Sequence, residues 1–153
     1  MPKLTNNERS PFTDIIKLDY AQLIEIGTGG TKVIATIPAG GAVELVALTN
    51  TVDIVGSSSL VVDVGTTFAD PDEFINALDV DAATVGLPTI NTGDAFTAGT
   101  GTSATGLSQA VKIVSAATPV YIKVTDAAIA SITAGEIVIG LRILDLTGQA
   151  SNA

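Results

Sequence analysis

Short runs in which apolar and polar residues alternate recur along this chain, and they predict β-strands. In the clearest run, residues 120–125, Val120, Ile122 and Val124 share one face. Residues 137–143 repeat the pattern with Ile, Ile, Leu and Ile. Val, Ile and Thr dominate such runs and suit a pleated, half-buried surface, whereas helical spacing is scarce. The pattern therefore predicts an all-β fold.

Weaker alternation predicts further strands at 15–26 (with a break near Asp19), 32–37, 42–48, 60–64 and 110–115. Glycine-rich turns at 27–30 and 38–41 should each lead one strand into the next, because Gly tolerates the positive φ of tight turns. About seven or eight strands in one domain predict a single-domain antiparallel β-sandwich, similar to a jelly roll. With only four Phe and two Tyr, its core should be mostly aliphatic.

Two segments depart from the strand pattern. Residues 71–78 are predicted as one short helix, because Asp70 can cap it, Pro71 suits its first position and the acids favour its positive end. Residues 91–109, rich in Gly, Thr, Ser and Ala, should form a long loop, which could be functional or only a mobile tip. The predicted organisation is an extended N-terminal arm (1–14), a sandwich domain (15–147) and a C-terminal tail (148–153).

The charge of the chain is concentrated in its middle. No Lys or Arg occurs between Val33 and Val111, both flanks are balanced, and the whole formal charge of −9 therefore belongs to that block. Nucleic acids and anionic membranes attract proteins through Lys and Arg, so neither is expected as a partner. The polar N-terminus lacks the apolar core of a signal peptide, and no stretch approaches the roughly 20 apolar residues that cross a bilayer.

The composition also limits catalysis. The chain of 153 residues has no Cys and no His, which removes the commonest general base and the commonest transition-metal ligands. The serines at 57–59 have no base to activate them, so we expect a turn there. We expect no enzyme activity and no cofactor. Whether the acids Asp70, Asp72, Glu73, Asp79 and Asp81 bind an ion stays open, because they could ligate Ca²⁺ but lack a recognised ligand loop.

The run 31–78, TKVIATIPAGGAVELVALTNTVDIVGSSSLVVDVGTTFADPDEFINAL, resembles a segment common in tailed-bacteriophage virion proteins. There a "tIPAGa" turn leads into a strand, followed by an outer strand of the form "lxvdvGt" and an acidic turn. The likeness continues more loosely into residues 120–146. It implies a capsid decoration (cement) protein, or a related β-rich virion structural protein. Such proteins are often trimeric, bind the major capsid protein on the outer surface of the head and bridge its subunits.

The N-terminal arm is the predicted contact with such a partner. Phe12 would be its apolar anchor, with Lys3 and Arg9 as charged contacts. Ile54, Val61 and Leu144 appear surplus to one core face and suggest a homotrimer interface. Two alternatives stay open: a head-fibre or tail-associated virion protein, and a ligand- or glycan-binding β-sandwich module.

Overall fold

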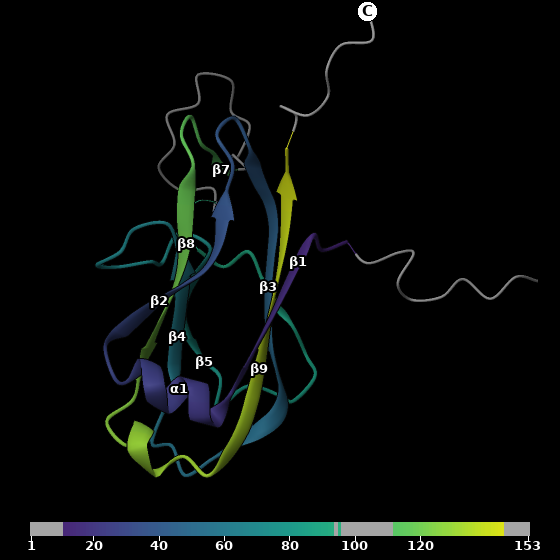
Figure 1. The fold of residues 1–153 in the computed structure, drawn as a ribbon. Helices are drawn as coiled ribbons and strands as arrows, with labels where there is room; N and C mark the ends of the chain where they lie inside the picture. The colour runs from purple at the N-terminus through teal and green to yellow at the C-terminus, as the bar shows by residue number, and fades with distance from the viewer. Residues whose placement is uncertain (1–10, 94, 96–111, 146–153) are drawn as a thin grey trace, which may run out of the picture.

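The computed structural model describes residues 11–93, 95 and 112–145. In that part of the chain, two antiparallel sheets pack into a sandwich, which confirms the predicted all-β class (Figure 1). The strands are β1 (Asp14–Asp19), β2 (Gly30–Ile37), β3 (Ala42–Val55), β4 (Val61–Gly65), β5 (Ile75–Asp79), β6 (Thr89–Ile90), β7 (Lys112–Ile113), β8 (Thr118–Thr125) and β9 (Ala134–Leu144). The helices are α1 (Tyr20–Ile26) and the 3₁₀ turn η2 (Ile129–Ser131).

The strands divide into two layers. Sheet A has the order β1-β9-β3-β6, with β7 also pairing with β3, and sheet B has the order β2-β8-β4-β5. All of these pairs are antiparallel. In the view of Figure 1 sheet A lies to the right, sheet B to the left, and α1 closes the lower end.

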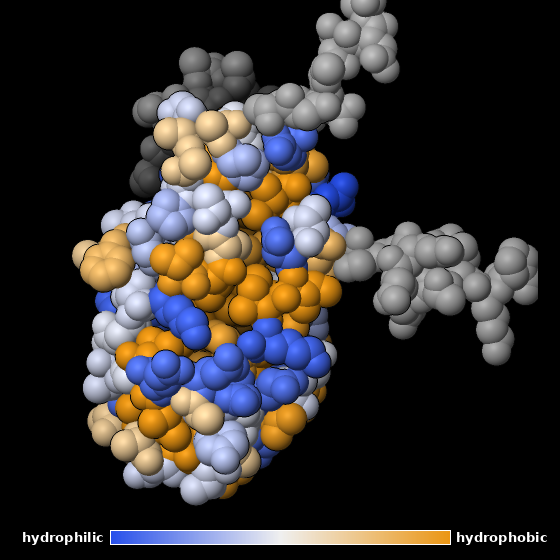
Figure 2. All heavy atoms as spheres, in the orientation of Figure 1, coloured by the Kyte–Doolittle hydropathy of each residue, from blue (hydrophilic) through white to orange (hydrophobic). Residues whose placement is uncertain are grey.

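The core lies between the sheets and is aliphatic, as the alternation predicted. Val120, Ile122 and Val124 of β8 are completely buried, and so are Ile137 and Ile139 of β9. Burying each such side chain contributes about 1.5–3 kcal/mol, so these runs dominate the stability of the sandwich. Between the edge strands β1 and β2 the core approaches the surface, and Figure 2 shows hydrophobic residues gathered there above a hydrophilic band.

The helix is in a different place from the one predicted. Residues 20–26 form α1, whose first turn is closed by a capping box in which Asp19 accepts from the Gln22 amide and the Gln22 side chain accepts from the Asp19 amide. The helix predicted at 71–78 is wrong. Phe74 and Ile75 are fully buried, and β5 pairs with β4. Burial of these two neighbours outweighs the local capping signal at 70–71.

Of the two predicted glycine-rich turns, only the one at 38–41 connects two strands. Residues 27–30 link α1 to β2, and residues 38–41 carry the chain from β2 in sheet B to β3 in sheet A. Of the strand predicted at 110–115, residues 112–113 form β7, residues 114 and 115 are described but lie in no strand, and residues 110 and 111 lie outside the described chain. Among the described helices, none has the length and apolar character needed to cross a membrane.

Candidate interaction surface

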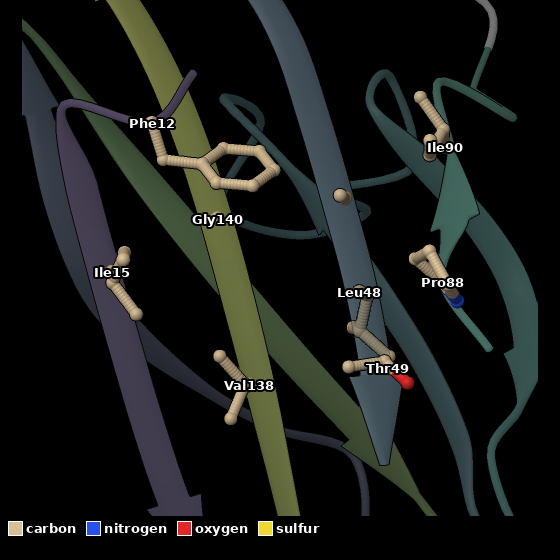
Figure 3. Close-up of a pocket in the computed structure, with 9 residues that line it drawn as sticks. Phe12, Ile15, Leu48, Thr49, Pro88, Ile90, Val138 and Gly140 are labelled. Atoms are coloured by element: carbon tan, nitrogen blue, oxygen red, sulfur yellow. The ribbon is translucent and has the colours of Figure 1, made fainter. Parts of the chain in front are cut away.

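A shallow hollow lies on the outer face of sheet A. Its volume is about 210 Å³. The residues around it are apolar except for one threonine: Phe12, Ile15, Ala47, Leu48, Thr49, Pro88, Ile90, Val138 and Gly140 (Figure 3). We call this hollow the sheet A groove.

Four of the five strands of sheet A, β1, β9, β3 and β6, give the groove a floor and two walls. Its floor is made of small or medium side chains on the central strands β9 and β3, including Gly140 and Ala47, which are register partners. One wall is Phe12 and Ile15, at the β1 side, and the other is Pro88 and Ile90, at the β6 side (Figure 3). The groove is therefore lined almost wholly by apolar atoms. A partner could bind it through complementary shape and burial of apolar surface.

Two features fix the position of Phe12: the hydrogen bonds of the next residue, Thr13, to β9, and the space left by Gly140, which has no side chain. The Thr13 amide donates to the Leu141 carbonyl at 2.8 Å, and the Thr13 hydroxyl accepts from the Ile143 amide at 2.9 Å. These bonds extend the contact with β9 beyond the start of β1. A Cβ on Gly140 would lie 2.6 Å from Cδ1 of Phe12, so the ring occupies the place that any other side chain at position 140 would take.

The charged groups beside the groove neutralise one another. Arg142 Nε lies 3.0 Å from Glu44 Oε2 near one end, and Lys17 Nζ lies 3.9 Å from Glu136 Oε1 near the other. Exposed pairs of this kind add about 0–1 kcal/mol each to stability. Each of these two cations beside the groove is therefore balanced by a glutamate, in a chain whose net charge is −9.

The acids of the central block serve local structure instead of forming one site. Glu73 accepts from the amide and hydroxyl of Thr66 and from the Thr67 hydroxyl, which closes the turn after β4. Burial raises the pKa of Glu73, but these hydrogen bonds together outweigh burial and hold the pKa below its ordinary value. There is no room for a side chain at Gly65 beside it, because a Cβ there would lie 2.8 Å from the backbone carbonyl carbon of Pro71 and 2.9 Å from the Glu73 amide nitrogen.

Asp79 and Asp70, also in the predicted acidic cluster, likewise make local contacts within the fold. Asp79 accepts from the amides of Asp81 and Ala82 and from the Ser59 hydroxyl, and Asp70 lies 3.6 Å from Lys123. Across residues 11–93, 95 and 112–145, no three metal-ligating side chains come together in a group that could hold an ion.

The serine turn at 57–59 is tied to a buried carboxylate. Asp126, only 2 % exposed, accepts from the hydroxyl of Ser58 at 2.6 Å and from the Ala128 amide at 2.9 Å. Burial alone would raise the pKa of Asp126, but the hydrogen bonds from Ser58, Ala128 and Ser59 lower it overall. A carboxylate with a lowered pKa is a weak base and does not activate Ser58. The hydrogen bond between Ser58 and Asp126 instead joins the serine turn to the turn that follows β8.

The residues predicted to contact partners lie in different environments, and some lie outside the described chain. Lys3 and Arg9 lie outside the described residues, and Phe12 packs on β9 of its own chain. Of the residues suggested for a trimer, Ile54 is buried in the core at 4 % exposure, so it is not available as surplus surface; Val61 and Leu144 are half-buried. Of the long loop, residues 91–93 are described and Asn91 pairs with β3, while 94 and 96–109 lie outside.

The groove itself was missed at the level of sequence. One signal could have found it: Gly140 interrupts the apolar run 137–141, and a glycine inside a strand often marks a close approach of another group. Ala47 and Ile90 carried no comparable signal, because only the pairing of β3 with β6 brings them together.

The sequence matches no protein-family model and no curated protein. Two solved structures match the chain. A chain of the cyanophage Pam1 capsid asymmetric unit superposes with a TM-score of 0.53 at 13% identity, and the match covers 92% of this chain and 96% of that one. A chain of the acidic stable capsid structure of Helicobacter pylori bacteriophage KHP30 gives a TM-score of 0.45 at 15% identity, with coverages of 86% and 92%. The Pam1 likeness shows a shared fold that spans nearly all of both chains.

Proposed function

We propose that this chain is a capsid decoration (cement) protein of a tailed bacteriophage. In this role a homotrimer sits on the outer surface of the head, binds the major capsid protein and reinforces the contacts between capsid subunits. The carrying observation is the fold match over nearly the whole length to a chain of the Pam1 capsid asymmetric unit. The virion-like sequence run 31–78 supports the same role independently of the fold match.

The surface of the sandwich suits a protein that works by binding. The outer face of sheet A carries an apolar groove with neutralised charge, whereas the acidic turns at 70–73 and 79–81 belong to the sheet B side. A molecule with such unlike sides can turn one toward partners and the other toward solvent. We propose the N-terminal arm, with Lys3 and Arg9, as the contact with the capsid; Phe12 packs on β9 of its own chain instead.

The mechanism is additional interface area without catalysis. A ligand that binds only the closed shell stabilises it by mass action, and every decorated contact must break before pressure from the packaged genome opens the head. Nothing in this role needs a nucleophile, a general base or a cofactor. We accordingly propose that the protein has no enzymatic activity.

Sedimentation with heads tests the proposal directly. The purified full chain is mixed with undecorated heads assembled from the major capsid protein encoded in the same genome, the heads are pelleted, and bound copies are counted by gel densitometry. We expect saturable binding at a fixed number of copies per capsid subunit, and added density on the outer surface by electron microscopy.

An unrelated acidic protein carried through the same spin controls for trapping in the pellet. Failure of the chain to pellet with heads would overturn the decoration role. Binding to purified tails or head fibres instead would identify a different virion component, and binding to neither would favour the ligand-binding module.

A further inference from the structure

We propose that the sheet A groove is covered by a second copy of this chain. The inference deepens the homo-oligomer part of the proposed function and rests on it, because it names the surface through which the copies meet. Three observations carry it: the exposed apolar walls, the charge balance of this face and the unlike shapes of the two walls.

The walls leave a large apolar area open to water. Ile15 is 57% exposed on one side of the groove and Ile90 is 49% exposed on the other. Between them the Phe12 ring covers Gly140 but leaves open a hollow of about 210 Å³. A contiguous apolar depression of this kind typically marks a contact with another macromolecule.

Charge selects the occupant. Two copies that each carry −9 repel one another, and the repulsion is strongest where the unneutralised acids lie. On the groove face, Arg142 and Lys17 each lie beside a glutamate, so each end presents one cation and one anion. Two such faces can approach with each cation near an anion, so a contact through this face adds little local repulsion to the general repulsion between two acidic copies.

The two walls differ in shape, which suits a head-to-tail contact. One wall presents the ring of Phe12 beside Ile15, and the other presents the compact pair Pro88 and Ile90 (Figure 3). If the first wall of one copy packs on the second wall of the next, the same contact repeats from copy to copy. Such a contact closes into a ring when the rotation from one copy to the next divides a full turn, and a homotrimer is the ring of three copies.

Matched charge insertions test the interface. Ile15→Glu and Ile90→Glu each place an acid on one wall, while Val33→Glu places the same acid at a similarly exposed position, 52% exposed, on β2 of sheet B. The mass of the full chain and each variant is measured by sedimentation equilibrium from about 1 to about 100 µM, a range over which mass action reveals weak oligomers. Circular dichroism establishes that each variant is folded, and the milder Ile15→Ser replaces any variant that is not.

We expect the full chain and Val33→Glu to form oligomers and both wall variants to dissociate at least tenfold more readily. Added NaCl should strengthen assembly of the full chain, because it screens the repulsion between acidic copies and leaves the apolar contact intact. A full chain that stays monomeric throughout the range would overturn the inference. So would a folded wall variant that assembles as tightly as Val33→Glu, or assembly that weakens as salt is added.

Head binding separates this inference from the proposed function. Wall variants that are monomeric but still pellet with heads would support the groove as the self-contact and keep the decoration role. Oligomers that never bind heads would support the inference about the groove while overturning decoration. Wall variants that assemble normally but lose head binding would show that the groove contacts the capsid, and would overturn the inference.

Discussion

At the scale of single residues, the placement of Phe12 depends on the absence of a side chain at position 140. A Cβ there would meet the Phe12 ring at 2.6 Å, so Gly140→Val should push the ring off β9. We expect Phe12→Ala to lower the free energy of unfolding by about 1 kcal/mol in the natural chain, since the ring is half-buried. In the Gly140→Val background the same substitution should cost almost nothing, as measured by urea unfolding.

A double-mutant cycle makes this prediction strict, because residues in contact show coupling of about 0.5–3 kcal/mol. Val33→Ala is the control, since Val33 lies on β2 of the opposite sheet and should add independently to Gly140→Val. Equal effects of Phe12→Ala in both backgrounds would mean that Phe12 and Gly140 do not contact one another in solution.

Asp126 gives the fold a defined dependence on pH. Because the folded pKa is lowered, the carboxylate stabilises the fold at pH values above its unfolded pKa of about 3.9. This contribution is lost as the pH falls through the lower, folded pKa. Asp126→Asn should therefore lower the free energy of unfolding by about 1.5–3 kcal/mol at neutral pH, and by progressively less below about pH 4.

Urea unfolding of both proteins at neutral and acidic pH tests this prediction. Asp70→Asn is the matched control, because the Asp70 side chain is 72% exposed and should change stability little at either pH. A destabilisation by Asp126→Asn that stays constant into acid would show that the charge of Asp126 plays no part.

At the scale of elements, Asn91 fills a gap in the edge of sheet A. Its Oδ1 accepts from the Val46 amide at 2.7 Å and its backbone amide donates to the Val46 carbonyl at 3.0 Å, between the short strands β6 and β7. Asn91 has a φ of 49°, which Gly also adopts without strain. Asn91→Gly therefore removes the side-chain bonds without straining the folded backbone, and it also gives the unfolded chain more freedom. Together these effects should cost about 1–2 kcal/mol.

Hydrogen exchange at the Val46 amide is the matching measurement. We expect its protection to fall roughly tenfold in Asn91→Gly, since 1.4 kcal/mol corresponds to a factor of ten. The Ile122 amide, in the fully covered strand β8, should keep its protection unless the whole domain is destabilised. Unchanged protection at Val46 would show that the Asn91 side chain does not close this edge.

The same scale shows what the sequence could predict. Strands β8 and β9 were predictable because each alternates in a way that matches its burial, with Val120, Ile122 and Val124 inside. Residues 20–26 were predicted as part of a strand because Leu23, Ile24 and Ile26 also suit a strand, although the D-x-x-Q pattern of the capping box was present at 19–22. The opposite error occurred at residues 71–78, where a helix was predicted and residues 75–78 instead lie in strand β5. Their capping signals were local, and the burial of Phe74 and Ile75 could not be read from them.

At the scale of the whole molecule, the candidate site could be predicted less well than the fold. The groove combines Phe12, Ala47, Ile90 and Gly140, which are far apart along the chain and meet only through the order β1-β9-β3-β6. Its neutrality likewise depends on pairs such as Arg142 with Glu44, separated by most of the chain. Net charge and turn chemistry are local properties and were accessible to sequence analysis, but strand order across two sheets was not.

Truncation of the arm is the prediction that belongs to this scale. Phe12 and Thr13 contact β9, so a cut after residue 10 preserves the folded unit while removing Lys3 and Arg9. We expect the truncated chain to unfold at the same urea concentration as the full chain, within about 0.5 kcal/mol, and to lose at least tenfold in head affinity. A cut after residue 13 should lose head binding too, but with about 1–2 kcal/mol of stability, because the contact of Phe12 with Gly140 goes with it.

Comparing removal of the two cations with removal of the whole arm then identifies which groups of the arm contact the capsid. Lys3→Gln combined with Arg9→Gln keeps the arm at full length, so a loss of head binding equal to that of the truncation would make the two cations the contact. A double variant that binds like the full chain, beside a truncation that does not, would place the contact in the apolar and backbone groups of residues 1–10. If the truncation after residue 10 binds heads as tightly as the full chain, the arm takes no part in docking. The capsid contact must then lie on the folded sandwich, where the wall variants and Val33→Glu already divide the two faces.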